Sequence, residues 1–168
     1  MAQVRIERLK KSFGPVEVLK DIDLEVEDGS FVVVWRSDSQ DGASSGIYGQ
    51  RFAANGTALG GEFRANTYTT SNQDEPDVAA LKDGGFIVVW RSEGQDLNGS
   101  GVYAQRYDAS GNTVGTEFRV NTTTGSQQLE PAVTGGTEMH VYVTSPSGAL
   151  DRADEITVQA ELAEADIP

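Results

Sequence analysis

The sequence contains no cysteine and only one histidine, and these two scarcities exclude several kinds of site. Without cysteine the chain forms no disulfide bond, no thiolate metal site and no cysteine nucleophile. One imidazole, that of His140, is too few for a histidine-rich metal centre. It lies in the alternating segment 139–144, a pattern that favours a surface position on a strand. We therefore expect no catalytic residues, and we predict that the chain is not an enzyme.

Long apolar runs and an excess of positive charge are also missing. No run approaches the ~20 apolar residues that cross a bilayer, so we expect no membrane insertion. The chain has 26 acidic and 13 basic residues, for a formal net charge of -13. Such a chain repels phosphate backbones, so we expect no nucleic-acid partner. Residues 1–14 carry charges but not the apolar segment of a signal peptide.

Glycine is unevenly distributed, and its distribution divides the chain. Of the 19 glycines, 17 lie between residues 28 and 136. The end of the chain, residues 137–168, has seven acidic residues against one basic residue. We predict four segments: an N-terminal hairpin segment, two repeats, and an acidic tail or degenerate partial third repeat. Their bounds are 1–27, 28–82, 83–136 and 137–168.

An internal duplication with a period of 55 residues is the strongest feature of the sequence. Residues 28–81 and 83–136 are identical at 29 of 54 positions and align without a gap. The segment Phe31–Trp35, for example, corresponds to Phe86–Trp90. Each residue of the first copy therefore has a counterpart 55 positions later, and the two copies should share one structure.

Each copy shows four short strands separated by turn residues. The valine-rich runs 31–35 and 86–90 indicate strands buried on both faces, whereas 47–52 and 102–107 alternate and should be half-buried. The remaining strands are predicted at 62–67, 76–81 and 117–122. We predict an all-β fold of antiparallel four-stranded units that resemble β-propeller blades, with a β-sandwich of meanders as the alternative. Trp35 and Trp90 should both be mostly buried, at equivalent places.

A third, weaker unit is predicted after the second repeat. It would start at 130–133, where Glu130-Pro131 matches Glu75-Pro76. Its second and third strands are expected at 139–144 and 156–162. Two or three open sheets leave exposed strand edges, which are sites of pairing with other chains. We therefore expect further repeats or self-association among the partners.

The repeat motif resembles a known kind of secreted repeat. Residues 76–107 follow the pattern P-x-V-A-A-L-x-D-G-G-F-x-V-V-W-x-S-x-x-Q-D, and a G-[IV]-Y-x-Q-R-[FY] motif completes it. Over residues 28–136 the chain resembles the tandem repeats of large secreted bacterial calcium-binding, haemolysin-type or adhesin-like proteins. The resemblance implies a non-catalytic structural or adhesive module, secreted or on the cell surface. The Gly-Gly-x-Gly-x-Asp repeats that bind calcium in such proteins are absent.

The first residues of the chain resemble another family. Residues 3–34 are similar to the opening of an ABC-transporter ATPase subunit of the sugar-importer kind, a cytoplasmic protein, in which the aromatic residue matching Phe13 stacks on adenine. That family places a phosphate-binding loop directly after the strand matching 31–34. Here Trp35-Arg36-Ser37 follows, with no glycine loop or lysine. A fusion or an inactive remnant of such a subunit is therefore an alternative. We expect no ATP binding, and a hairpin that pairs with the first repeat.

Acidic residues recur in one inter-strand loop of both copies and are candidate calcium ligands. Carboxylate and amide oxygens suit Ca²⁺, which needs about 6–8 oxygen ligands. A solvated turn is the alternative interpretation, since each loop offers few such groups and neither has the spacing of an EF-hand. A calcium-stabilised binding module is thus an alternative function, with no other cofactor expected. The candidate ligands are Asp38, Asp41, Glu93, Asp96 and Asn98.

Aromatic and arginine residues also recur as pairs, at Trp35-Arg36 and Trp90-Arg91, together with the pairs Gln50-Arg51 and Gln105-Arg106. An aromatic ring beside a guanidinium can bind a sugar or a cation. The same duplication is expected if these residues only build each sheet. Packing is the favoured interpretation, and a carbohydrate or protein surface is the alternative.

Overall fold

The fold is described by a computed structural model. It describes residues 4–13, 16–26, 29–40, 42, 44–96, 99–122, 127–135, 140–144 and 156–157, of which 4–26, 140–144 and 156–157 are described by their backbone alone. Within these ranges every regular element is a β-strand. None of the described residues belongs to a helix with the length and hydrophobicity needed to cross a bilayer.

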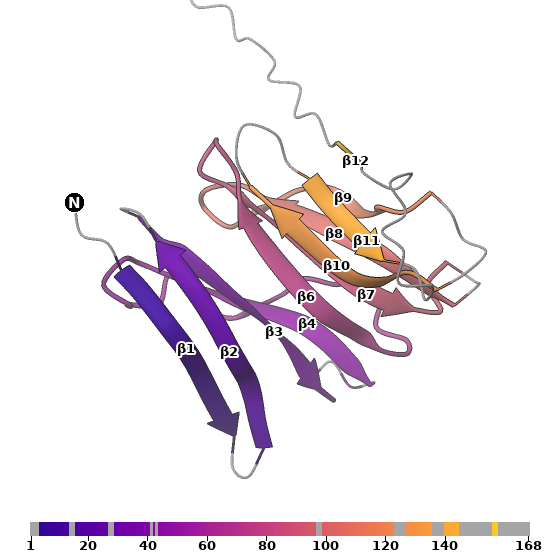
Figure 1. Ribbon diagram of the computed structural model, residues 1–168, viewed down its shortest axis with the longest axis horizontal. Coiled ribbons are helices and arrows are strands. Elements are labelled where there is room, and N and C mark those ends of the chain that lie inside the picture. The colour runs from indigo at the N-terminus through magenta and orange to yellow at the C-terminus, as the bar shows by residue number, and fades with distance from the viewer. Residues whose placement is uncertain are drawn as a thin grey trace, which may run out of the picture.

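The described residues form twelve strands in four antiparallel sheets (Figure 1). An N-terminal hairpin holds β1-β2, sheet 1 holds β3-β4-β5, sheet 2 holds β6-β7-β8-β9, and sheet 3 holds β10-β11-β12. The strands are β1 (Val4–Phe13), β2 (Val16–Val26), β3 (Phe31–Asp38), β4 (Ser45–Phe52), β5 (Phe63–Arg64), β6 (Gln73–Ala80), β7 (Phe86–Glu93), β8 (Ser100–Tyr107), β9 (Thr113–Arg119), β10 (Leu129–Thr134), β11 (His140–Thr144) and β12 (Ile156–Thr157).

The predicted all-β fold with antiparallel units is confirmed, and the two copies use the same strand register. Trp35 pairs with Tyr48 in sheet 1, and Trp90 pairs with Tyr103 in sheet 2. Sheet 2 is a complete four-stranded meander, whose first strand, β6, precedes the repeat boundary at residue 83. The sequence period and the sheet are thus offset by one strand. The division of the chain into the four predicted segments stays a prediction.

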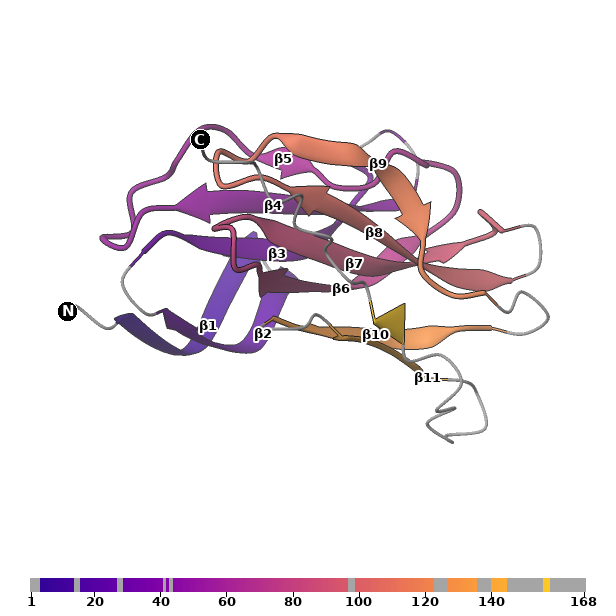
Figure 2. The same ribbon diagram turned by 90° about the horizontal axis from the view of Figure 1, so that it is seen from above.

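The three sheets lie face to face, with sheet 2 in the middle (Figures 1 and 2). Along β7, Phe86, Val88 and Trp90 pack against sheet 1. The alternate residues Ile87 and Val89 pack toward β10 of sheet 3. All five are at most 5% exposed. The prediction that this valine-rich run is buried on both faces therefore holds for sheet 2, because a sheet covers each side.

The corresponding run of sheet 1 is covered less completely. Val33 and Val34 are buried, but Phe31, Val32 and Trp35 are only half-buried. This difference follows from position, since sheet 1 is the outer member of the three-sheet stack. Trp35 and Trp90 therefore occupy equivalent places in their sheets but differ in burial.

Strands β4 and β8 are more deeply buried than their alternating sequence predicts. In β8 the residues from Ser100 to Gln105 are all buried, and in β4 the first five residues are buried. The half-buried prediction was wrong because both strands lie inside their sheets, with a hydrogen-bonded neighbour on either side. In β8, for example, Tyr103 packs in the cluster shared with sheet 1 instead of facing water.

The N-terminal hairpin forms a sheet of its own. β1 and β2 pair antiparallel with three shifts of register, and β2 contacts β3 without joining its ladder. The expected pairing of this hairpin with the first repeat is therefore wrong. Such irregularities increase the twist of a two-stranded ribbon, which turns its edge away from a flat continuation of the sheet.

Sheet 3 follows sheet 2 and contains short strands. β10 pairs with β11, and β11 pairs with β12 through His140–Thr157 and Val141–Ile156. The expected third strand at 156–162 is described only for Ile156–Thr157. The assignment of 137–168 to a partial third repeat stays a prediction, because most of these residues are outside the described ranges.

Candidate functional site

The candidate calcium ligands are only partly described, and those at the strand ends have partners within the chain. Arg36 donates to Asp38 through Nε at 3.0 Å and Nη2 at 2.8 Å, in an exposed pair. The counterpart of Asp38 is Glu93, which accepts a hydrogen bond from Asn72 Nδ2 at 2.9 Å. Asp41 and Asn98 lie outside the described residues. Across the described ranges, no three histidine, aspartate or glutamate side chains gather as a metal site would require.

The remaining candidate, Asp96, lies beside the buried start of β8. A side chain added at Gly101 would meet Asp96 Oδ2 at 3.1 Å and Asn121 Oδ1 at 3.3 Å. Burial raises the pKa of Tyr103, and the negative charge of Asp96 raises it further. The carboxylate is therefore turned toward the sheet. The described candidate ligands are not gathered into one site, and two of the five candidates lie outside the described residues. The calcium site therefore stays a prediction.

A repeated side-chain contact connects each loop to a glutamate of its own sheet's outer segment: Glu62 just before β5, and Glu117 within β9. Gln40 donates to Glu62, and its counterpart Gln95 donates to Glu117 Oε1 at 2.5 Å. Glu117 Oε2 also accepts from Thr67, through the backbone N–H at 2.6 Å and Oγ1 at 3.0 Å. Glu117 thus connects sheet 2 to the chain leaving sheet 1.

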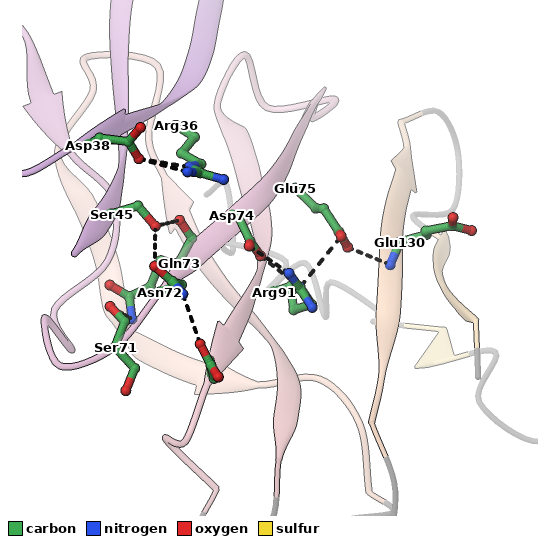
Figure 3. Close-up of polar contacts among 11 residues, drawn as sticks. Arg36, Asp38, Ser45, Ser71, Asn72, Gln73, Asp74, Glu75, Arg91 and Glu130 are labelled. Carbon is green, nitrogen blue, oxygen red and sulfur yellow. Dashed lines mark hydrogen bonds and ion pairs between the residues drawn. The ribbon is translucent and has the colours of Figure 1, made fainter. Parts of the chain in front are cut away.

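Polar side chains gather along the first half of β6 and the ends of β3 and β7, and we call this set the polar row (Figure 3). Its centre is Arg91, which holds both oxygens of Asp74, at 2.7 Å from Nε and 2.6 Å from Nη2. Glu75 is 3.5 Å from the same guanidinium. The hydrogen bond to Asp74, together with nearby carboxylate charges, raises the pKa of Arg91. The polar row consists of Arg36, Asp38, Asn72, Asp74, Glu75, Arg91 and Glu93.

A backbone irregularity within the polar row is repeated in sheet 3. Glu75 and its counterpart Glu130 both have a positive φ, 52° and 50°, and each precedes a proline. Both lie at a break in the pairing register of their strand. Glu75 Oε2 accepts the backbone N–H of Glu130 at 2.8 Å, and Asp77 Oδ2 accepts that of Val133 at 2.8 Å. These carboxylates connect the edge strands of sheets 2 and 3.

A second polar arrangement occurs in both repeats and is fully buried. Asn66 Oδ1 accepts the backbone N–H of Ile47 at 2.7 Å, and its Nδ2 donates to Gln73 Oε1 at 3.2 Å. Asn121 accepts from Val102 at 2.8 Å and donates to Gln128 at 3.1 Å. All four amide side chains are at most 3% exposed. We call each Asn–Gln pair an amide latch: Asn66–Gln73 and Asn121–Gln128.

Each amide latch holds the segment that carries the chain from one sheet to the next. Asn66 follows β5, an edge strand of sheet 1, and Gln73 begins β6, an edge strand of sheet 2. The hydrogen bond between the two side chains therefore spans the same two sheets as the chain segment between them. The latch also explains why the outer strands of both copies end at Arg64 and Arg119, before the predicted ends at 67 and 122. Ala65 N–H still bonds to Ile47 O at 2.8 Å, but the next ladder partner of Ile47 is the Asn66 side chain.

The recurring Trp–Arg and Gln–Arg pairs also make contacts inside the molecule. Trp90 is 0% exposed and packs with residues of sheets 1 and 2. Gln105 Nε2 donates to the Arg106 carbonyl at 2.9 Å, and Gln50 Nε2 to the Arg51 carbonyl at 2.9 Å. Arg51 reaches across to sheet 2 and donates to the carbonyls of Ala109, at 2.7 Å, and Ser110.

The sequence analysis did not identify the amide latches, although their signal was present. Asn66, Gln73, Asn121 and Gln128 are identical between copies, but the prediction placed Asn66 and Asn121 only as members of the strands 62–67 and 117–122. The polar atoms of a buried amide side chain need hydrogen-bond partners. An asparagine and a glutamine that both recur 55 residues later therefore indicate a structural contact.

The chemistry available to the polar row is that of charge-assisted hydrogen bonds between strands. In the polar row both oxygens of Asp74 are held by Arg91, and Glu75 holds β10. The carboxylates are thus used to join strands, which suits a structural part of the molecule.

No family model matches the chain, and no curated protein matches it. Among solved structures, the chain is similar to the endo-arabinase from Bacteroides thetaiotaomicron VPI-5482, with 16% sequence identity and a TM-score of 0.46. The match covers 78% of this chain and 54% of the arabinase chain, so the chain spans about half the length of that enzyme. A likeness of this extent carries no argument about activity, and the expectation that the chain is not an enzyme stays a prediction.

We predict that calcium and magnesium at matched ionic strength raise the melting temperature alike. The chain carries a net charge of -13, so any added salt screens self-repulsion. Asp38 and Glu93 have partners already, and each loop offers fewer oxygen ligands than a calcium shell of about 6–8 needs. Thermal melts followed by tryptophan fluorescence measure this.

The contrary result is a calcium-specific rise of several degrees at micromolar ion. It would support the calcium-stabilised module only if Asp41→Ala combined with Asp96→Ala abolished it. The matched control is Asp108→Ala, which removes a carboxylate from a hairpin turn outside both loops.

Proposed function

We propose that the chain is a non-catalytic structural or adhesive module of a secreted or cell-surface protein, in which each 55-residue repeat adds one sheet to a stack. The observation that carries this proposal is the place of residues that are identical in both copies: they lie between sheets or at the crossings from one sheet to the next. Trp90, Asn66 and Asn121 are buried, and they pack sheets together or fix the crossings between them. A module extended by repetition needs its repeated residues in these places.

Contacts between sheets 1 and 2 support the same proposal. Arg51 reaches from sheet 1 to sheet 2, and Glu117 reaches from sheet 2 to the segment that leaves sheet 1. Such contacts between neighbouring units give a repeat array its cohesion. An outer surface of the array, whether for a protein or a carbohydrate, would carry the adhesive role.

The test is an assay of hydrolysis combined with one of adhesion. The purified chain, incubated with arabinan and a panel of other polysaccharides, is expected to release no reducing ends. If one of the insoluble polysaccharides is a ligand, the chain should co-sediment with it. Hydrolysis that increases in proportion to the protein added would overturn the proposal. An equally acidic protein of similar mass is the control for charge-driven retention.

ATP binding would distinguish the structural module from the alternative of an ABC-transporter ATPase remnant, and we expect none. Because Val34 leads to Trp35-Arg36 in place of a phosphate-binding loop, nothing in that stretch would hold the phosphates. Calorimetric titration with Mg-ATP is expected to give no heat of binding. A sub-millimolar dissociation constant would favour this alternative over the structural module.

A further inference from the structure

One edge of sheet 1 is open where the same edge of sheet 2 is filled. Among the described residues, β3 is the end strand of sheet 1, whereas its counterpart β7 has β6 on one side and β8 on the other. The two counterparts pair with β4 and β8 in the same register. Sheet 2 therefore shows what kind of strand fits beside β3.

Two charged side chains near the end of β7 hold the start of the strand that fills this edge. Arg91 binds both oxygens of Asp74, at 2.7 Å and 2.6 Å, and Glu93 accepts a hydrogen bond from Asn72 at 2.9 Å. Charge-assisted bonds of this kind are among the stronger hydrogen bonds in proteins. The start of β6 is thus fixed to β7 by side chains as well as by the backbone ladder.

On β3 the counterparts of these two side chains are Arg36 and Asp38, and they bind each other (Figure 3). Their side chains are 49% and 68% exposed, against 25% for Arg91. An exposed pair of this kind contributes little to stability, so its exchange for bonds to an added strand costs little. Both charged groups are therefore available to a strand that comes from elsewhere.

The N-terminal hairpin does not supply the missing strand. By the 55-residue offset, Leu19 and Lys20 of β2 stand where β6 has Asp74 and Glu75, so the carboxylate that Arg36 would bind is absent. β2 pairs with β1, and it diverges from β3 toward the end of β3 that carries the charged pair (Figure 1). None of the described strands joins β3 along this edge.

We propose that the open edge of β3 takes up an extended acidic segment of another polypeptide, of the Asn-Gln-Asp-Glu-Pro kind that begins sheet 2. Its aspartate would bind Arg36 and its asparagine would bind Asp38, as the start of β6 binds β7. A second copy of this chain is not the donor, because its matching strands, β6 and β10, already pair with β7 and β11. The inference rests on the proposed role as a stack of repeated sheets.

The forces available at this edge make the binding selective. Main-chain hydrogen bonds supply affinity when a strand is added to a sheet, and side-chain contacts supply specificity. The net charge of -13 repels an acidic segment at long range, so the attraction has to come from the contacts at β3. Acidic peptides without the right order of residues should therefore not bind.

A titration followed by fluorescence anisotropy of a labelled peptide tests the proposal with the full chain. The peptide has the sequence of residues 72–81, Asn-Gln-Asp-Glu-Pro-Asp-Val-Ala-Ala-Leu. The protein concentration runs from about 1 µM to about 1 mM, a range that covers weak and moderate affinities. Saturable binding is expected for this peptide, and none for a scrambled peptide of the same composition.

Charge reversal locates the site. Arg36→Glu should weaken binding about tenfold or more, because a charge-assisted bond is lost and a like charge is introduced. A peptide carrying Asp74→Arg should bind this variant more tightly than the unchanged peptide does. The matched control is Arg64→Glu, an exposed arginine on β5, at the opposite edge of the same sheet. It should bind the unchanged peptide like the wild type.

Several results would overturn the proposal. These are a wild-type chain that does not bind the peptide at about 1 mM, equal binding of the scrambled peptide, and equal weakening by Arg36→Glu and Arg64→Glu. Self-association of the chain that Arg36→Glu abolishes would also overturn it, since the donor would then be a second copy. The fluorescence of the buried Trp90 reports whether each variant is folded. Failure of peptide binding removes this partner alone, because the non-catalytic role is tested separately by polysaccharide hydrolysis.

Discussion

Replacing Trp90 by alanine is expected to lower the free energy of unfolding by about 3–5 kcal/mol, the usual cost of removing a large aromatic side chain from a core. Trp90 is 0% exposed and lies in the cluster that joins sheet 2 to sheet 1. Its removal therefore leaves a cavity between sheets, where neither sheet can close the gap without losing its register. Urea unfolding followed by circular dichroism measures the change, as a lower midpoint at an unchanged slope.

The repeat supplies a matched control at Trp35. This residue has the same register and the same neighbours along its strand, but it is half-buried at the outer face of sheet 1. Trp35→Ala should therefore cost clearly less than Trp90→Ala. Equal losses would show that the outer face of sheet 1 is as well covered as the interior of the stack.

A conservative change at Trp90 separates its packing from its polarity. Among the described residues, the buried indole N–H has no hydrogen-bond partner. Trp90→Phe removes that N–H together with part of the ring, so lost packing is partly offset by the relief of a buried unpaired donor. We expect a loss smaller than that of Trp90→Ala. A phenylalanine variant as unstable as the alanine variant would contradict this division.

The sequence predicted the repeated elements well because a duplication compares two versions of each strand. The offset of 55 residues placed Trp35 and Trp90 in equivalent positions, and their pairing with Tyr48 and Tyr103 confirms that equivalence. The strand type of 86–90 was also predictable. An unbroken apolar run is compatible with a strand that has a sheet on both sides.

Burial could not be predicted from the repeat, because identical sequences have different neighbours. Trp35 and Trp90 have the same local sequence, yet Trp90 is packed against sheet 1 and fully buried, whereas Trp35, on the outer face of sheet 1, is half-buried. The alternation of apolar and polar residues in 102–107 likewise predicted that one face of this strand is exposed to solvent. It could not show that Tyr103 and Gln105 would be buried by the stacking of sheets distant in the chain.

The candidate loop site was predictable in position but not in its bonding. The sequence placed Asp38 and Glu93 at equivalent strand ends, which the structure also does. Their partners differ: Asp38 accepts from Arg36 of its own strand, whereas Glu93 accepts from Asn72, the residue just before β6. The second contact depends on how the chain crosses between sheets, and no local pattern encodes that crossing.

The amide latches provide the second large effect, and Asn66 is the position to test. Asn66→Ala removes the acceptor of the Ile47 N–H and the donor to Gln73 Oε1, and it leaves both of these buried groups unpaired. An unsatisfied buried polar group costs about 1–3 kcal/mol, so we expect Asn66→Ala to lower the free energy of unfolding by about 2–4 kcal/mol. Asn121→Ala should have a similar effect, because its bonds to Val102 and Gln128 are the same.

The control for this prediction is an asparagine that is exposed. Asn55 accepts the backbone N–H of Thr57 at 3.0 Å in a surface turn, where water can replace the side chain. Asn55→Ala should therefore be clearly milder in the same urea titration. If Asn66→Ala proved as mild as Asn55→Ala, the crossing between sheets would be held by the packing of its apolar neighbours, and the latch would be a consequence of the fold. A loss of the expected size at both Asn66 and Asn121 instead makes the latch a condition for adding each sheet to the stack.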